Sequence, residues 1–304
     1  MVSIVKRKIQ EKVYYYLSYS YREGNKVKLI EKSLGKEIPS EDELIQLKED
    51  LIRRIVKERW ELTIEELKKR YSQKLREIPE FSKAERLKEF GIRFTYHSNK
   101  IEGSTLTLRE VALAINEKEI KINKSVNDIN EAQLHMLCYE DMIATKEDLT
   151  LDLVRKWHET LFSLHVNRSK LAGIIRKDPI LISGSKHIPP ISPQPLLDDL
   201  FEWYNNNKGR VYSVLLACFM HYRFEFIHPL NDGNGRMGRF IMNYILFKNK
   251  YPMFDINSKI RTSYYNALEK SDLSDDEMFF VRWFFKNYIK SFKEKYNNYF
   301  FKNN

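Results

Sequence analysis

One stretch, residues 228–239 (HPLNDGNGRMGR), constrains this chain more than any other. Its Asp-Gly-Asn-Gly segment admits positive φ values that most side chains resist. The apolar run that begins at Arg236 is compatible with a helix. Successive backbone N–H groups can therefore converge at a helix N-terminus, where the helix dipole favours an anion. The stretch predicts a loop-to-helix junction that binds an anion through Gly233, Asn234 and Gly235.

Four polar side chains of this stretch suit chemistry on a phosphate. Arg236 and Arg239 are three residues apart, so they share a helix face and can form a polyphosphate cradle. Asp232 can hold Mg²⁺, which takes carboxylate, phosphate and water oxygens. His228 is a candidate general base because its unperturbed pKa is near neutrality. Each residue alone has an ordinary structural explanation, but their combination in one short stretch favours a functional site.

The stretch resembles the signature of the Fic family, His-x-Phe-x-Asp/Glu-Gly-Asn-Gly-Arg-x-x-Arg. Leu230 replaces the usual Phe and is expected to serve as an apolar anchor. The resemblance extends over residues 86–285. It implies a mainly α fold with a helical core, and transfer of AMP from ATP to a protein hydroxyl. It further implies that Arg236 and Arg239 clamp the β- and γ-phosphates, and that the metal at Asp232 is Mg²⁺ or Mn²⁺.

A second segment, residues 98–103, can be interpreted together with this signature. Residues 98–103 alone describe a helix end with a glycine stop. Ser98, Glu102 and Gly103 match, in order, the family's inhibitory motif Ser/Thr-x-x-x-Glu-Gly/Asn. The resemblance implies that Glu102 pairs with Arg239 in the place of the γ-phosphate, as in the class of the family with an N-terminal inhibitory helix, here near 86–103. The alternative is a surface glutamate at a helix end.

Two further segments resemble family elements around the nucleotide. The short β-branched run 180–190 contains a glycine turn and ends at Pro-Pro, so it predicts a small β-hairpin. It resembles the family's flap, which pairs with the target's main chain; its turn residues are Ser183, Gly184, Ser185, Lys186 and His187. The nucleotide base and ribose are expected against Tyr264, Tyr265 and Asp272, although relatives often carry Asn in place of the last.

The N-terminal third differs from the rest. Residues 1–38 form a basic, tyrosine-rich segment whose pattern predicts a β-hairpin with a turn at 23–26. A solvated basic edge is favoured over a nucleic-acid surface. Residues 39–80 predict a long helix that opens with the capping box Ser40/Glu43 and serves as a strut or as a homodimer contact. The Fic domain is expected over 81–290, with a helical tail at 291–304.

The core helices follow from apolar periodicity and capping signals. A helix is expected to start at Ser82, and another behind the capping box Thr107/Glu110. The segment 211–226 is apolar on nearly all sides, so it predicts the buried central helix that delivers His228. The other helices are expected at 107–116, 127–145, 151–164, 194–207 and 276–300.

Composition adds limits rather than a function. The 304 residues carry a net charge of +10 that is spread along the chain, which favours solubility over a nucleic-acid role. Cys138 and Cys218 lie in apolar helical runs, which predicts reduced core residues and no disulfide or zinc framework. No apolar run approaches membrane-spanning length. A cytoplasmic protein without a membrane partner is therefore expected.

These observations predict a protein adenylyltransferase whose substrates are ATP and an unidentified protein, which can be the chain itself. Three rivals stay open. Glu102 could orient water for the reverse hydrolysis of AMP from a modified protein. A kinase-like branch of the family transfers phosphate, but it carries Lys where this chain has Gly235. A nucleic-acid-binding module with an idle core is disfavoured because the signature is complete.

Overall fold

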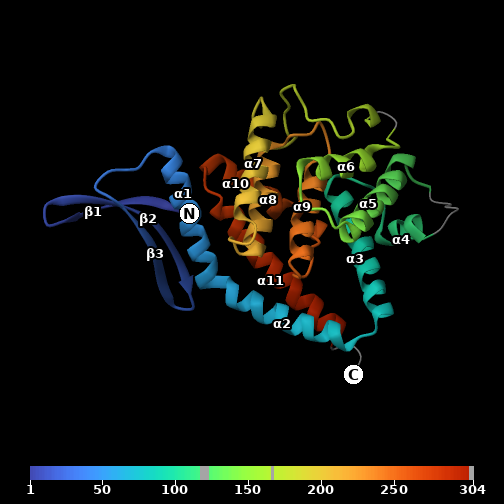
Figure 1. Ribbon diagram of the computed structural model, residues 1–304, viewed down its shortest axis with the longest axis horizontal. Helices are drawn as coiled ribbons and strands as arrows, with labels where there is room; N and C mark the ends of the chain where they lie inside the picture. Colours follow the sequence, from blue (N-terminus) through green and yellow to red (C-terminus); the bar gives the residue numbers. More distant parts are fainter. Residues whose placement is uncertain (117–122, 166–167, 301–304) are drawn as a thin grey trace.

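The computed structural model describes residues 1–116, 123–165 and 168–300, with side chains described up to residue 294. The chain is mainly α-helical, as expected, with one small sheet projecting from the helical body at its N-terminal end (Figure 1). The hairpin predicted within residues 1–38 is part of a three-stranded antiparallel sheet in the order β1-β2-β3. The strands are β1 (Ser3–Ile9), β2 (Lys12–Glu23) and β3 (Lys26–Gly35).

The first strand of this sheet was not expected from the sequence. Its turn to β2 uses Gln10 and Glu11, whose φ angles are 46° and 69°. Positive φ at both central residues is the geometry of a tight hairpin turn, but that turn normally carries Asn or Gly. The turn between β2 and β3 contains Gly24, at φ 58°, and was recognisable for that reason. Leu17, on β2, is fully buried against the helical body.

The predicted strut forms and packs on the core. Helix α1 (Glu41–Val56) begins at Ser40, whose side chain accepts a 3.4 Å hydrogen bond from the Glu43 N–H. A π-helical turn (Lys57–Glu61) continues it into α2 (Leu62–Glu77), which runs along the edge of the body beside α11 (Met278–Phe300) (Figure 1). Arg223 of the central helix α8 (Ser213–Ile227) donates a 2.9 Å hydrogen bond to Glu49 on α1. The strut is therefore attached directly to the central helix.

The remaining helices occur close to where the sequence places them. The start expected at Ser82 is wrong by two residues: α3 (Glu80–Ile101) begins directly after Pro79, whose fixed φ is already compatible with a helix entry. The capping box of α4 (Leu108–Asn116) is confirmed, with hydrogen bonds between Thr107 and Glu110 of 2.7 and 3.2 Å. The other expected helices are α5 (Val126–Ala144), α6 (Leu151–Phe162), α7 (Pro193–Asn207) and α9 (Asn234–Lys248). Helix α10 (Arg261–Ser274) has no counterpart among the predicted helices.

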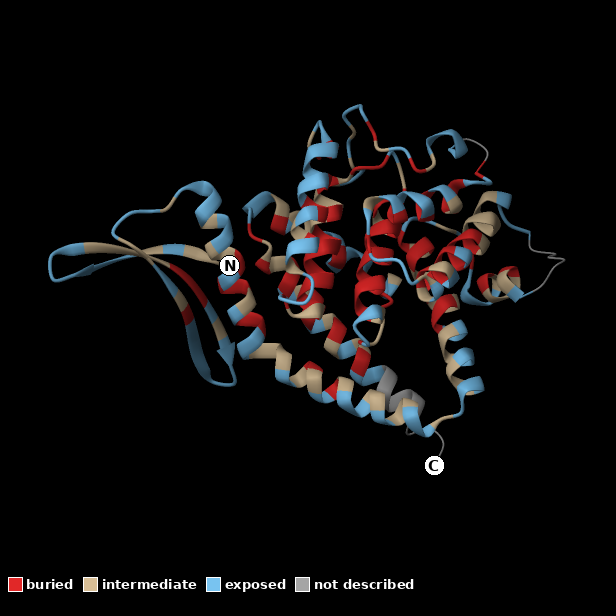
Figure 2. Cartoon of the chain, viewed as in Figure 1, coloured by how far each residue is buried: buried red, intermediate tan, exposed pale blue. Residues whose placement is uncertain are grey.

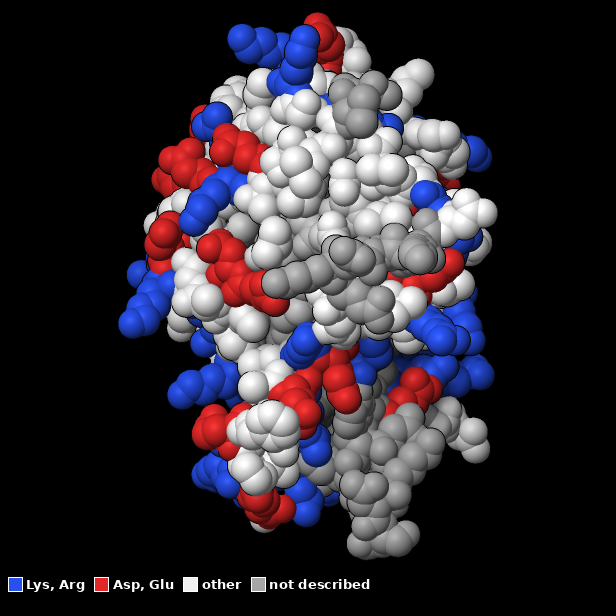
Figure 3. Space-filling model, turned by 90° about the vertical axis from the view of Figure 1, so that its right-hand side faces the viewer, with Lys and Arg blue, Asp and Glu red and all other residues white. Residues whose placement is uncertain are grey.

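Helices α8 and α9 form the centre of the molecule. Both are buried along almost their whole length, whereas the surrounding helices bury one face (Figure 2). The expected buried central helix is thus confirmed, and Cys138 and Cys218 are free thiols in the core. On the face shown in Figure 3, Lys and Arg are interspersed with Asp and Glu around an uncharged middle. Within the described residues, no helix is long and apolar enough to span a membrane.

The segment 180–190 departs from its prediction. It is an extended loop with a turn in which the Ser185 N–H donates to the Ile182 carbonyl (3.1 Å), and it forms no strand pair. Glu269 on α10 accepts from the Lys186 N–H at 2.6 Å, and the His187 ring donates to the Phe226 carbonyl at 2.9 Å. The expected hairpin is wrong because these polar groups find their partners on helices rather than on a second strand.

Candidate active site

The signature stretch folds as the predicted loop and helix start. His228 ends α8 at φ 48°, and Gly233 precedes α9 at φ 76°. Leu230 is buried and forms an isolated β-bridge with Ile175, which confirms its role as an apolar anchor. The Asn234 side chain closes the loop by two 2.8 Å hydrogen bonds with the Leu230 backbone. The side-chain amide of Asn234 thus shapes the loop, and only the backbone N–H of this residue remains to bind an anion.

Glycine is required at positions 233 and 235 because a side chain would not fit there. A Cβ on Gly233 would lie 2.7 Å from the Phe162 ring, and a Cβ on Gly235 would overlap Glu102 and lie 2.9 Å from Arg239 Nη1. The backbone can therefore approach a ligand closely only because these positions lack side chains.

His228 is held in the form that a general base needs. Arg176, which is buried, donates to the His228 carbonyl at 2.8 Å and also to the Pro190 carbonyl at 2.5 Å. His228 Nδ1 lies 3.2 Å from the Glu225 carbonyl, so this nitrogen carries the proton and Nε2 is left as the acceptor. Burial lowers the pKa of His228 to about 4. The ring is therefore neutral at pH 7 and can accept a proton.

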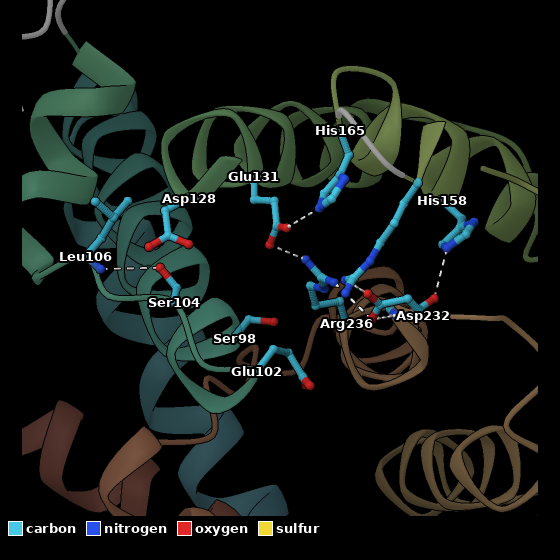
Figure 4. Close-up of polar contacts among 12 residues, drawn as sticks. Ser98, Glu102, Ser104, Leu106, Asp128, Glu131, His158, His165, Asp232 and Arg236 are labelled. Carbon is cyan, nitrogen blue, oxygen red and sulfur yellow. Dashed lines mark hydrogen bonds and ion pairs between the residues drawn. The ribbon is translucent and has the colours of Figure 1, made fainter. Parts of the chain in front are cut away.

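Arg239 is paired with the predicted inhibitory segment. Its Nη2 donates to Glu102 Oε1 at 2.6 Å, and its Nε donates to Ser98 Oγ at 3.0 Å. Burial would raise the pKa of the Glu102 carboxyl, but the charges of Arg239 and Arg236 outweigh it and hold that pKa below its usual value. Gly103, at φ 105°, ends the helix directly after Glu102. The expected contact between Glu102 and Arg239 is present, and Figure 4 shows Ser98 and Glu102 beside the start of α9.

Arg236 already has partners in this state. Its Nη1 donates to Glu131 on α5 at 2.6 Å, and its Nη2 lies 3.4 Å from Asp232 Oδ1. Glu131 also lies 3.6 Å from the His165 ring, so it sits between the Arg236 guanidinium and this imidazole (Figure 4). Arg236 is 2% exposed. This arginine therefore braces the loop against α5, while its Nε has no hydrogen-bond partner among the described residues.

Asp232 is accessible but engaged. Its carboxylate accepts from the Gly233 N–H at 2.6 Å and forms an ion pair with Arg168. His158 supports the loop, since its ring donates to the Asp232 carbonyl at 3.0 Å and accepts from the Gly173 N–H at 2.8 Å. A cavity of about 260 Å³ is lined by this group: His158, Phe162, Arg168, Leu171, Asn231 and Asp232.

This donor set bears on the expected metal. No group of three metal-ligating side chains occurs within the described part of the chain. A single carboxylate beside a cavity fits Mg²⁺, which is bound by one or two carboxylates together with substrate phosphates and water. Mg²⁺ would have to displace Arg168 from Asp232.

The expected base and ribose contacts are only partly available. Tyr264 is fully buried, and its hydroxyl donates to Glu225 Oε1 at 3.1 Å. The Asp272 side chain is 7% exposed, with Oδ2 3.8 Å from His187 Nδ1. Tyr265 alone of the three is exposed, and its hydroxyl lies 3.4 Å from the Ile101 carbonyl. The hydroxyl of Tyr264 thus points into the core, and the contact of this residue with a nucleotide stays a prediction.

The structure adds residues that sequence reasoning missed. Glu131, Arg168 and Arg176 reach the signature loop from other elements, and their spacing in the sequence carries no signal for it. Glu225 had a signal, because it lies three residues before His228 and four after His221 on one helix face.

Comparisons with known proteins agree with this geometry. Residues 148–246 match the model of the Fic/DOC family. A protein adenylyltransferase Fic of Drosophila sechellia is 31% identical over 194 residues, which cover 62% of this chain and 39% of the relative. That of Nematostella vectensis is 29% identical over 199 residues, covering 62% and 45%. The chain thus spans less than half the length of these curated relatives.

The solved structures extend the agreement to the fold. A Fic-domain-containing signaling protein from Bacteroides thetaiotaomicron superposes with a TM-score of 0.65 at 27% identity, covering 76% of this chain and 94% of its own. The family model matches residues 148–246, which contain the complete signature, and the fold around them is similar to that of a Fic-domain structure.

Proposed function

We propose that this protein is an adenylyltransferase that moves AMP from ATP to a protein hydroxyl and is inhibited by its own Glu102. The observation that carries the proposal is the carboxylate of Glu102, bound by Arg239 directly above Gly235. A carboxylate oxygen held by an arginine at a helix N-terminus stands in for a phosphate oxygen. The site is thus built for an anion, and an internal group occupies it.

The residues of the site divide the reaction between them. The N–H groups of the Gly233–Gly235 turn and Arg239 would hold the phosphates, and the flap residues 183–187 would line the target. His228 Nε2 accepts the proton of a Ser, Thr or Tyr hydroxyl on the target, while the oxygen of that hydroxyl attacks the α-phosphorus of ATP. The bond from that phosphorus to the bridging oxygen breaks, and pyrophosphate leaves. Mg²⁺ at Asp232 would supply charge neutralisation to the phosphates.

The test follows label from α-³²P-ATP into protein. Glu102→Gly is expected to incorporate more AMP than the wild type, into itself or into a protein of a lysate. The double variant Glu102→Gly/His228→Ala is the matched control and should stay unlabelled. No label in any variant would refute transfer.

Removal of AMP is the second candidate, favoured by the 29% exposure that the Glu102 side chain retains beside the site. A carboxylate there can orient water as well as exclude a phosphate. A protein already carrying AMP separates the two: the wild type would release the AMP, and Glu102→Gly would lose this activity. Binding of labelled DNA or RNA that weakens with salt would instead indicate the disfavoured nucleic-acid role.

A further inference from the structure

A buried chain of polar side chains leads from the core to His228. His221 and Glu225 lie four residues apart on one face of α8, and His228, three residues further on, is the left-handed residue that ends the helix. His221 Nε2 donates to the Tyr264 hydroxyl at 2.9 Å, and this hydroxyl donates to Glu225 Oε1 at 3.1 Å. The other carboxyl oxygen, Oε2, lies 3.9 Å from His228 Nδ1. The chain therefore ends at the nitrogen that carries the proton in the resting ring.

Packing alone gives no reason for a carboxyl group at this position. The Glu225 side chain is 10% exposed, and Tyr264 is the one side chain whose hydrogen bond to it is described. A buried carboxylate is costly unless it is paired. The charged or titratable groups that face it are His228 on its own helix, Arg239 on α9, Tyr264 and Asp272 on α10, and Glu102 at the end of α3.

We propose that Glu225 is a positioning residue for His228, supplying the negative charge that stabilises the imidazolium formed when His228 accepts the hydroxyl proton. The backbone carbonyl and the side-chain carboxylate of Glu225 act together. Its carbonyl fixes the tautomer of the ring, at 3.2 Å from Nδ1, and its carboxylate faces the same nitrogen once the ring is charged. The inference rests on the proposed transfer reaction and names a further residue of that site.

The same geometry couples the inhibitory segment to the base. Burial raises the pKa of Glu225 to about 7, and the negative charge of Glu102 adds to this rise while Arg239 opposes it. When Glu102 leaves, one of these negative charges is removed, so Glu225 ionises more readily. Departure of Glu102 therefore frees Arg239 and, until a phosphate takes its place, favours the charged form of Glu225 beside His228.

The kinetic test uses Glu102→Gly as the parent. Adding Glu225→Gln should lower kcat by about 10- to 100-fold, less than loss of the base itself, with KM for ATP nearly unchanged. The parent's kcat should rise with pH as Glu225 ionises, and the Gln variant should lack this rise. Glu225→Asp should recover part of the rate. Tyr264→Phe removes a hydrogen bond to the carboxylate, so the rise should move to higher pH.

Glu65→Gln is the matched control. Glu65 also accepts hydrogen bonds from tyrosine hydroxyls, those of Tyr212 and Tyr251, but it lies on the strut helix α2. It should leave kcat and the pH profile of the parent unchanged. An equal loss in Glu65→Gln, or a Glu225→Gln variant with the parent's kcat and pH profile, would overturn the inference.

A second measurement does not depend on transfer. The ¹⁵N shift of the His228 imidazole, assigned by its loss in His228→Ala, should report the ionisation of Glu225 as a step near pH 7 in the wild type and none in Glu225→Gln. Absence of that step in the wild type refutes the inference. If the step is present but Glu102→Gly transfers no AMP, the inference about the charge beside His228 stands and the proposed function fails.

Discussion

Replacing Glu102 by Gln removes the charge that Arg239 binds while keeping the size of the side chain. Charge-assisted hydrogen bonds contribute about 1.5–3 kcal/mol. The contact measures 2.6 Å, and Arg239 is 1% exposed whereas Glu102 is 29% exposed, so solvent weakens the pair only on one side. If this carboxylate competes with a phosphate for Arg239, its loss should tighten ATP binding by about 10- to 150-fold.

The same change should weaken the fold in the absence of ATP. Arg239 would remain buried with Ser98 as its hydrogen-bond partner and no carboxylate bound to its Nη2. Removing one partner of a buried pair is strongly destabilising, and with Glu102 partly exposed we expect about 2–3 kcal/mol in the free energy of unfolding. Because ATP binds the folded state, saturating ATP should restore the melting temperature.

Calorimetric titration of ATP·Mg²⁺ and thermal unfolding with and without ATP measure both effects. Glu89→Gln, an exposed glutamate on the same helix α3, controls for the loss of one charge. Glu102→Gln with the ATP affinity and the melting temperature of wild type would refute the competition for Arg239.

Three other changes have defined outcomes. His228→Ala should lower AMP transfer by about 10²–10⁴-fold with ATP affinity retained. Because the pKa of His228 is about 4, a pH-rate profile should show loss of the base toward pH 4 as a second fall, below the one that protonation of Glu225 causes. Asp232→Ala should abolish the Mg²⁺ dependence of ATP binding. Arg168→Ala should lower the Mg²⁺ concentration that ATP binding needs, because it frees the Asp232 carboxylate. Unchanged Mg²⁺ titrations of ATP binding in both variants would contradict the metal role of Asp232. Gly233→Ala should destabilise the fold by about 1–3 kcal/mol in denaturant unfolding, because its φ is 76° and the new Cβ would meet Phe162.

The central site could be predicted because its residues are adjacent in sequence. The glycines of residues 228–239 specify a turn and helix start through local backbone preferences. The contact between Glu102 and Arg239 spans 137 residues, and no periodicity indicates it; only the family's inhibitory motif suggested it.

The remainder of the site depends on tertiary packing. Glu131 meets Arg236 because α5 crosses beside α9, and a charged residue on a helix carries no mark of its distant partner. The resemblance to the family places both Tyr264 and Tyr265 near the nucleotide, yet the helix turns the Tyr264 ring into the core and leaves Tyr265 exposed. In residues 180–190, β-branched composition indicated a strand, but contacts with helices decided the loop conformation.

The position of Glu102 at the very end of α3 sets how fast the site can be vacated. Ile101, one residue earlier, is fully buried, while Glu102 is the C-cap and its N–H bonds only to Asn99 and Lys100 within the last turn. Withdrawing the carboxylate therefore needs a side-chain rotation or fraying of one turn, with the rest of α3 in place. Helix ends open with small free energies, and helix–coil exchange takes about a microsecond or less. If Glu102 competes with a phosphate as proposed, its occupancy is a rapid equilibrium, and the ATP concentration sets the fraction of molecules that are open at any moment.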